Sequence, residues 1–214
     1  MTALAAALAR GEPMTDTHNP GGADGAAGEP TLENAYDSGW MDTGIAWNES
    51  FWAGLDPVRV MHLNPHWHME KPPRERYEVE DILVERTFTV TPDCGMQCGA
   101  FVAAFPEIGL YLAARRQDSG TTALSYRYTP RPGLGFTADD AEKTARYWLP
   151  SLREYSRLYE AETLKLRFWR VFMNRVVLTM NPTQRRISGF MFKLTLLEIA
   201  LIIALGLGWY FFAG

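Results

Sequence analysis

The C-terminal end of the chain most limits what this protein can fold into, because residues 194–214 form an almost uninterrupted apolar run. A helix of about 20 apolar residues spans the roughly 30 Å hydrocarbon core of a bilayer. Inside lipid, every backbone N–H and C=O must find a partner, which a single run achieves only as a helix. The sequence therefore predicts a folded domain followed by one transmembrane anchor at residues 190–214.

Charged and aromatic residues at the two ends of this run predict its orientation. Arg185, Arg186 and Lys193 precede the run, and no charged residue follows it. By the positive-inside rule, we expect a cytoplasmic N-terminal domain and a C-terminus on the far side of the membrane. Trp209 and Tyr210 fall at the far interface, the depth that amphipathic rings prefer. The alternative is a signal peptide before a secreted domain, but the apolar start is short and has no positive charge before it.

Two features inside the anchor predict that it also contacts a partner. Ala200, Ala204 and Gly208 recur every four residues and form a stripe along which another helix could pack closely. The alternative is that common membrane residues share this spacing by chance. Glu198 lies about one turn inside the span on the opposite face, where a carboxylate needs a partner unless it reaches the interface. We expect these four residues to bind an integral-membrane protein complex.

The net charge of −4 is unevenly distributed along the chain. Residues 1–150 carry 12 Lys and Arg against 21 Asp and Glu, whereas residues 151–186 carry eight basic against three acidic side chains. Basic charge therefore gathers beside the anchor, where a bilayer with anionic headgroups attracts it. The acidic body argues against a nucleic-acid partner, which requires a basic face.

Composition and periodicity divide the chain ahead of the anchor into four segments. We expect a disordered or extended tail, an aromatic-rich irregular arm, a small α+β domain and a basic amphipathic juxtamembrane helix. In that order they occupy residues 1–33, 34–76, 77–160 and 161–186. The predicted fold class is α+β, with a small antiparallel sheet followed by two helices and the single C-terminal transmembrane helix.

The predicted sheet occupies residues 77–128. A β-rich run begins at Tyr77 and alternates as far as Val90, with a phase slip near Asp81 that suggests a bulge. A turn is expected at residues 91–95. The strands that should follow, separated by a proline break and a glycine-containing hairpin turn, are residues 98–105, 108–114 and 121–128.

Two helices are predicted after the sheet. Thr137 and Asp140 have the spacing of a capping box, which predicts a helix from there to Leu149. Pro150 should break or kink this helix, because proline lacks the N–H that an interior position needs. A second helix should then run towards Met180.

The second helix has an apolar surface with one narrow polar stripe, formed by Arg167, Arg170 and Asn174. Such a helix just ahead of an anchor suits the membrane interface, and Trp169 suits headgroup depth. A core helix of the domain is the alternative. The predicted membrane-interface residues are Arg167, Trp169, Arg170, Arg175, Arg185, Arg186, Lys193, Trp209 and Tyr210.

The aromatic arm contains Trp40, Trp47 and Trp52, interspersed with Gly, Asp and Asn. Large aromatic side chains on irregular backbone need a surface to cover. That surface is either the core of the domain itself or a partner protein, because Trp and Tyr are enriched at interface hot spots. We therefore include these three tryptophans among the predicted partner-binding residues.

A histidine cluster is the one pattern that suggests metal chemistry. His62, His66 and His68 lie close in sequence, and Cys94 and Cys98 could add thiolates, which suit zinc or Cu(I). The spacing fits no common zinc site, and the proline between the first two histidines prevents an ordinary helix there. The same spacing is compatible with surface histidines and reduced thiols, and two cysteines imply no disulfide framework.

No common catalytic motif is present, since the chain lacks G-x-S-x-G, P-loop, G-x-G-x-x-G and H-E-x-x-H patterns. The sequence therefore favours a non-catalytic accessory or assembly subunit of a larger integral-membrane complex, with no cofactor. A respiratory or photosynthetic complex is a suitable host by analogy. The alternative is a membrane-tethered metal-binding or metal-delivery protein that uses the three histidines.

Overall fold

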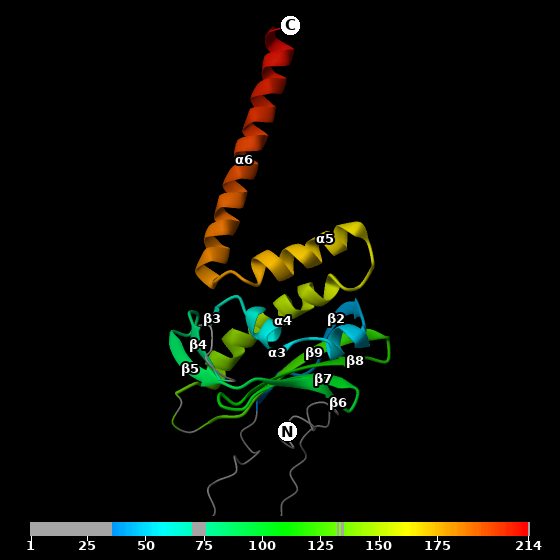
Figure 1. Ribbon diagram of the computed structural model, residues 1–214, viewed down its shortest axis with the longest axis vertical. Coiled ribbons are helices and arrows are strands. Elements are labelled where there is room, and N and C mark those ends of the chain that lie inside the picture. Colours follow the sequence, from blue (N-terminus) through cyan, green and yellow to red (C-terminus); the bar gives the residue numbers. More distant parts are fainter. Residues whose placement is uncertain (1–35, 70–75, 132, 134, 214) are drawn as a thin grey trace, which may run out of the picture.

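The computed structural model describes residues 36–69, 76–131, 133 and 135–213, without the side chains of residues 186, 206 and 208–213. The predicted N-terminal tail therefore lies outside the described residues. The fold is α+β with antiparallel sheets, and its C-terminal helix is apolar enough to span a membrane. In Figure 1 the helices lie on one side of the sheets, and the last helix projects away from the domain.

The larger sheet is antiparallel and has the strand order β1–β9–β8–β7–β6, with β2 also paired to β9. The predicted strand at residues 121–128 is confirmed. Three strands were missed: β1 and β2 lie in the segment predicted to be irregular, and β6 overlaps residues 91–95, where only a turn was predicted. The strands are β1 (Tyr36–Asp37), β2 (Met41–Ala46), β6 (Asp93–Gln97), β7 (Ala100–Phe105), β8 (Leu110–Arg116) and β9 (Thr121–Tyr128).

A glycine moves the start of β8 two residues beyond the predicted strand. Gly109 has a φ of +67°, and its carbonyl accepts a hydrogen bond from the backbone N–H of Thr129 at 2.8 Å. A Cβ at this position would lie 1.9 Å from the carbonyl oxygen of Thr129. The close approach of two backbone segments therefore requires glycine here.

The smaller sheet consists of β3 (Trp67–Met69), β4 (Tyr77–Asp81) and β5 (Arg86–Val90). The predicted bulge near Asp81 is wrong, since this position begins the turn of a hairpin. The buried Asp81 carboxylate accepts hydrogen bonds from the backbone N–H of Leu83 at 2.9 Å and of Val84 at 3.4 Å. It also accepts from Trp67 Nε1 at 2.9 Å and Thr144 Oγ1 at 3.0 Å, which fixes the hairpin to helix α4 (Ala138–Arg157).

The predicted irregular arm is also wrong, because its described part belongs to the domain. It contributes β1, β2 and β3, together with helices α2 (Glu49–Ala53) and α3 (Pro57–His62). Its alternation is hidden because Gly39 and Gly44 adopt positive φ, and the pairing of β2 with β9 shifts register after Asp42. The α+β domain therefore begins by Tyr36.

Helix α4 (Ala138–Arg157) begins at the predicted capping box but continues past Pro150. Its buried residues recur at three- and four-residue spacing, and Trp148 donates from Nε1 to the carbonyl oxygen of Val60 at 2.8 Å. Pro150 and Arg146 both lie on the exposed face, so water can reach the carbonyl that proline leaves without an intrahelical donor. The predicted break is therefore absent because packing on the opposite face holds the helix together.

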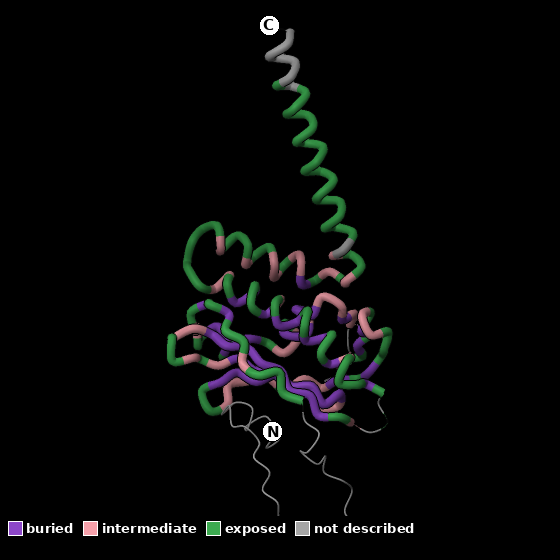
Figure 2. The backbone as a smooth tube through the Cα atoms, turned by 180° about the vertical axis from the view of Figure 1, so that it is seen from behind, coloured by how far each residue is buried: buried purple, intermediate pink, exposed green. Residues whose placement is uncertain are grey.

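The core lies between the sheets and α4. Trp67 and Trp148 pack with ring centroids 4.4 Å apart, and Phe105 lies 5.0 Å from Trp148 and 5.5 Å from Trp67. Figure 2 shows the buried backbone concentrated in the large sheet and along one side of α4, whereas the C-terminal helix is exposed. This core fixes the position of α4, which contacts α3 through Trp148 and Val60.

Two helical segments occupy the place of the predicted second helix, and a third contains the predicted apolar anchor. They are α5 (Leu164–Phe172), a π-helix η2 (Met173–Val177) and α6 (Pro182–Ala213). Thr163 caps α5, because its hydroxyl accepts from the backbone N–H of Leu166. In Figure 1, α5 lies beyond α4 on the side away from the sheets, and across the base of α6.

Candidate functional site

Helix α6 presents a long apolar surface that the described domain does not cover. Its Pro182–Leu205 stretch, 24 residues with a mean hydropathy of 1.9, is long and apolar enough to cross a membrane. Every described side chain from residue 187 to 207 is exposed, including Glu198, Ala200 and Ala204. The coordinates thus agree with the predicted apolar helix. Gly208, Trp209 and Tyr210 lie among the positions whose side chains are not described.

Arg185 fastens the base of α6 to the domain. Its Nη1 donates to the carbonyl oxygen of His62 and its Nε to that of Val177, each at 2.8 Å, while Nη2 lies 3.4 Å from the carbonyl oxygen of Leu178. These carbonyls terminate α3 and η2, where helix C-termini carry partial negative charge. The prediction that Arg185 faces lipid headgroups is therefore wrong. Arg186 lies outside the described side chains, and Lys193 is exposed on α6.

A closed ring of hydrogen bonds holds η2 on α4. The Tyr155 hydroxyl donates to Asn174 Oδ1 at 2.7 Å, and Asn174 Nδ2 donates to the Tyr159 hydroxyl oxygen at 3.3 Å. The two tyrosine hydroxyls lie 3.1 Å apart. Because Tyr155 already uses its proton on Asn174, Tyr159 is the donor of the third bond. All three side chains are therefore paired.

Two of the three residues in the predicted polar stripe, Arg170 and Asn174, contact the domain, whereas Arg167 is exposed. Arg170 donates from Nη1 to Glu162 Oε1 at 2.8 Å, and its guanidinium carbon lies 5.1 Å from the ring centroid of Tyr159. Asn174 belongs to the ring described above. The guanidinium of Arg170 is therefore already paired within the chain, and its membrane-interface role stays a prediction. The domain contacts decide this direction, because a carboxylate and an aromatic face lie beneath the helix.

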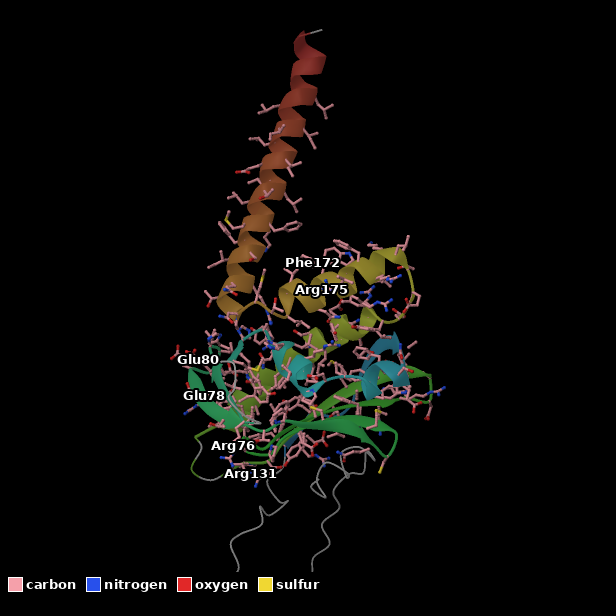
Figure 3. All side chains as sticks on the ribbon, in the orientation of Figure 1. Arg76, Glu78, Glu80, Arg131, Phe172 and Arg175 are labelled. Atoms are coloured by element: carbon pink, nitrogen blue, oxygen red, sulfur yellow. The ribbon has the colours of Figure 1, made fainter. Side chains whose placement is uncertain are left out.

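The opposite face of α5 is exposed and aromatic. Phe168, Trp169 and Phe172 are 62%, 41% and 36% exposed, and their ring centroids lie 5.6 to 6.2 Å apart. Arg167 and Arg175 are also exposed. Figure 3 shows Phe172 and Arg175 on the side of the domain from which α6 projects, with Arg76 and Arg131 on the opposite side.

The three tryptophans predicted to bind a partner belong to the fold. Trp52 is 1% exposed in the core, so no partner can reach it without unfolding. Trp47 stacks on Trp52 with ring centroids 5.9 Å apart. Trp40 packs against a small cluster on the other face of the large sheet, and the guanidinium carbon of Arg115 lies 4.1 Å from its ring centroid. The surface that these aromatic side chains need is provided by their own domain.

The three histidines do not converge. His62 ends α3, His66 packs its ring against Tyr147 with centroids 4.8 Å apart, and His68 lies in β3 opposite Glu80. Within the described parts of the chain, no three His, Cys, Asp or Glu side chains form a group that could hold a metal ion. Burial raises the pKa of the Cys94 thiol to about 12, which disfavours the thiolate that binds metals. The metal-delivery alternative therefore gains no support from the geometry.

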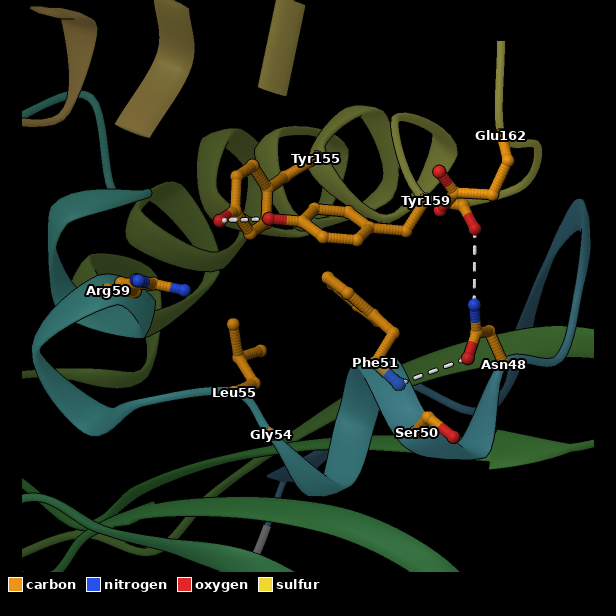
Figure 4. Close-up of a pocket in the computed structure, with 9 residues that line it drawn as sticks. All are labelled: Asn48, Ser50, Phe51, Gly54, Leu55, Arg59, Tyr155, Tyr159 and Glu162. Carbon is orange, nitrogen blue, oxygen red and sulfur yellow. Dashed lines mark hydrogen bonds between the residues drawn. The ribbon is translucent and has the colours of Figure 1, made fainter. Parts of the chain in front are cut away.

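A pocket of about 280 Å³ lies between α2, the start of α3 and the end of α4 (Figure 4). Most of its polar side chains are already paired: Asn48 accepts from the backbone N–H of Phe51 at 3.0 Å and donates to the carbonyl oxygen of Tyr159 at 3.1 Å. Glu162 is held by Arg170. Arg59 lines the pocket as an exposed cation. These side chains fix the helices around the pocket and show no nucleophile aligned with a base.

Comparisons with known proteins indicate no function for this chain. No family model and no curated protein match the sequence. A crystal structure of a protein from Chromobacterium violaceum is similar in part, with 12% identity and a TM-score of 0.35 over 61% of this chain and all of that one. A likeness at this level carries no argument about fold or function.

Proposed function

We propose that this protein is a single-span, non-catalytic membrane subunit that binds and helps to stabilise a larger integral-membrane complex. The observation that carries the proposal is α6, an apolar helix whose described side chains between residues 187 and 207 are all exposed. A helix that is apolar on every side is buried in a large core or in a membrane. The described domain offers no such core around α6, so lipid and partner helices are the environment that it fits.

The surface of α6 favours a partner inside the membrane. Ala200 and Ala204 lie on one face, continued by the backbone position of Gly208, and small residues allow close helix packing. Glu198 lies on the opposite face, where a carboxylate in hydrocarbon requires compensation. A respiratory or photosynthetic complex is a suitable class of host by analogy with other single-span subunits, and residues of this chain do not specify it.

The proposed orientation places the domain in the cytoplasm. Positive charge on the domain side of the span comes from Lys165, Arg167, Arg175, Arg186 and Lys193, which by the positive-inside rule favours the cytoplasm. A protease added to right-side-out vesicles should therefore leave residues 36–180 intact. Digestion of that region without detergent would reverse the orientation and leave the span itself unaffected.

Co-purification in mild detergent tests the proposed partnership. Ala204→Leu should reduce recovery of the partner complex, because the larger side chain separates the helices by an amount worth about 1–2 kcal/mol, or about five- to thirtyfold in affinity. Membrane insertion should be unchanged, since leucine is favourable in hydrocarbon. Ile202→Leu, a volume-conserving change outside the stripe, is the matched control.

Two results would contradict the proposal. If an equally apolar but scrambled span retained the partner, α6 would be a passive tether and recognition would belong to the domain. If the intact chain brought down no membrane protein from its native membrane, the accessory-subunit function itself would be wrong.

A further inference from the structure

We infer that the outward face of α5 lies in the bilayer interface, so that the domain rests on the membrane through this helix as well as through α6. The inference deepens the proposed function and rests on it, because the span of α6 sets the position of the membrane. The occupant assigned to this face is a lipid surface with anionic headgroups.

The exposed face of α5 has the shape of an apolar stripe. At about 100° per residue, Leu164, Phe168, Val171 and Phe172 share an arc about 100° wide, the width of an apolar stripe on an amphipathic helix. Their side chains are 85%, 62%, 52% and 36% exposed. Contiguous exposed apolar patches mark interaction sites, so this face requires an occupant that the described domain does not provide.

Basic side chains lie on both sides of that face. Lys165 and Arg167 lie on either side of the apolar arc, and both are exposed. Long cationic side chains at these positions can extend to headgroups while the arc between them enters the acyl boundary. Arg175 adds an exposed cation in η2. The apolar centre and the basic flanks together match an anionic lipid surface, because its headgroups attract basic segments.

The position of α5 relative to α6 also fits a membrane surface. Figure 1 shows α5 lying across the base of α6, so a membrane that α6 crosses has its surface along α5. The tyrosine–asparagine ring and Arg185 hold this arrangement, because they join η2 to α4 and the base of α6 to η2. The aromatic face therefore points away from α4 and continues the apolar surface of α6. That continuity favours lipid over a separate protein partner.

The test measures the depth of single fluorescent labels on the full chain in proteoliposomes of phosphatidylcholine with phosphatidylglycerol. Cys98 is exposed and would be replaced by serine, whereas the thiol of Cys94 is partly buried with a raised pKa. Labels are then placed by Phe168→Cys, Leu201→Cys and Arg76→Cys. Brominated lipids quench labels by contact, with bromine near the headgroups or deep in the acyl chains.

The label at position 168 should be quenched by shallow bromines several-fold more than the label at position 76, which lies on the side of the domain opposite α6 (Figure 3). Removing phosphatidylglycerol, or changing Lys165 and Arg167 to glutamine, should weaken that quenching. Phe172→Ser should also weaken it, with domain folding verified by near-UV circular dichroism.

The label at position 201 separates the two proposals. Deep quenching at 201 with none at 168 would leave the span intact and overturn the assignment of α5 to lipid. Absence of quenching at 201 would contradict the proposed membrane span, and this inference would fall with it.

Discussion

Arg185, in the first turn of α6, donates a hydrogen bond from Nη1 to the carbonyl oxygen of His62, which lies 123 residues earlier at the end of α3. The same guanidinium binds the carbonyls of Val177 and Leu178. One side chain therefore joins the ends of two helices at the point where the apolar helix leaves the domain. An arginine suits this position because its fixed fork of donors can bind several carbonyls at once.

We predict that Arg185→Met destabilises the domain and loosens α6. The variant loses charge-assisted hydrogen bonds to three helix-terminal carbonyls, which should lower the free energy of unfolding by about 2–3 kcal/mol. Denaturant unfolding of the full chain in detergent measures this. Arg175→Met, which changes an exposed arginine, should shift the free energy of unfolding by less than about 0.5 kcal/mol. Equal effects of the two variants would show that the three carbonyls need no arginine.

Asn174→Leu should lower stability by about 1–2 kcal/mol, because it removes one donor and one acceptor from the ring that joins η2 to α4. The hydroxyls of Tyr155 and Tyr159 would then have only each other as hydrogen-bond partners within the ring. Hydrogen exchange should also become faster in α5 and η2 than in α4, since those segments lose their fixed attachment. Tyr147→Phe, which removes a hydroxyl from the exposed face of α4, is the control. Unchanged exchange in α5 would mean that apolar packing alone holds the helix.

The stability of the domain should fall as the pH falls below about 6.5, the ordinary pKa of histidine. Burial lowers the pKa of His62, and the positive charge of Arg185 lowers it further, with Asp56 opposing. The unfolded chain therefore binds this proton more readily than the folded chain, so stability is present above the ordinary pKa and is lost as pH falls through the lowered one. Melting temperatures between about pH 7.5 and about pH 5 measure the loss.

His62→Gln should flatten this dependence on pH, because glutamine cannot take up the proton. His68→Gln keeps His62 and should keep the acid sensitivity. A melting temperature that falls equally in all three proteins would assign the effect to other groups.

Pro150→Ala should stabilise the domain by about 1–2 kcal/mol. Alanine restores the backbone N–H that can donate to the carbonyl of Arg146, and proline in a helix interior costs about 3 kcal/mol, partly offset by its rigidity in the unfolded chain. Chemical unfolding would measure the gain, with Glu142→Ala as a control for helix propensity on the same exposed face. A loss of stability would indicate that α4 needs a bend at this position.

Several elements could be predicted because their signals are local. Each of three signals lies within a single element: the apolar run of α6, the alternation of β9 and the Thr137–Asp140 capping box of α4. Each element was found at its predicted place. The β4–β5 hairpin was missed although a signal existed. Asp81 is followed by four residues without alternation, a length that fits a turn closed by an aspartate side chain.

The sequence by itself determined that the chain has an α+β domain and one apolar helix long enough to cross a membrane, since hydrophobic periodicity and run length are properties of the chain alone. Only the tertiary structure decided which side of each element is covered. Trp52 enters the core, Arg170 turns to Glu162, and Arg185 binds backbone carbonyls because partners distant in sequence lie there. Arginines and tryptophans suit both interfaces and interiors, so their residue type cannot choose between them.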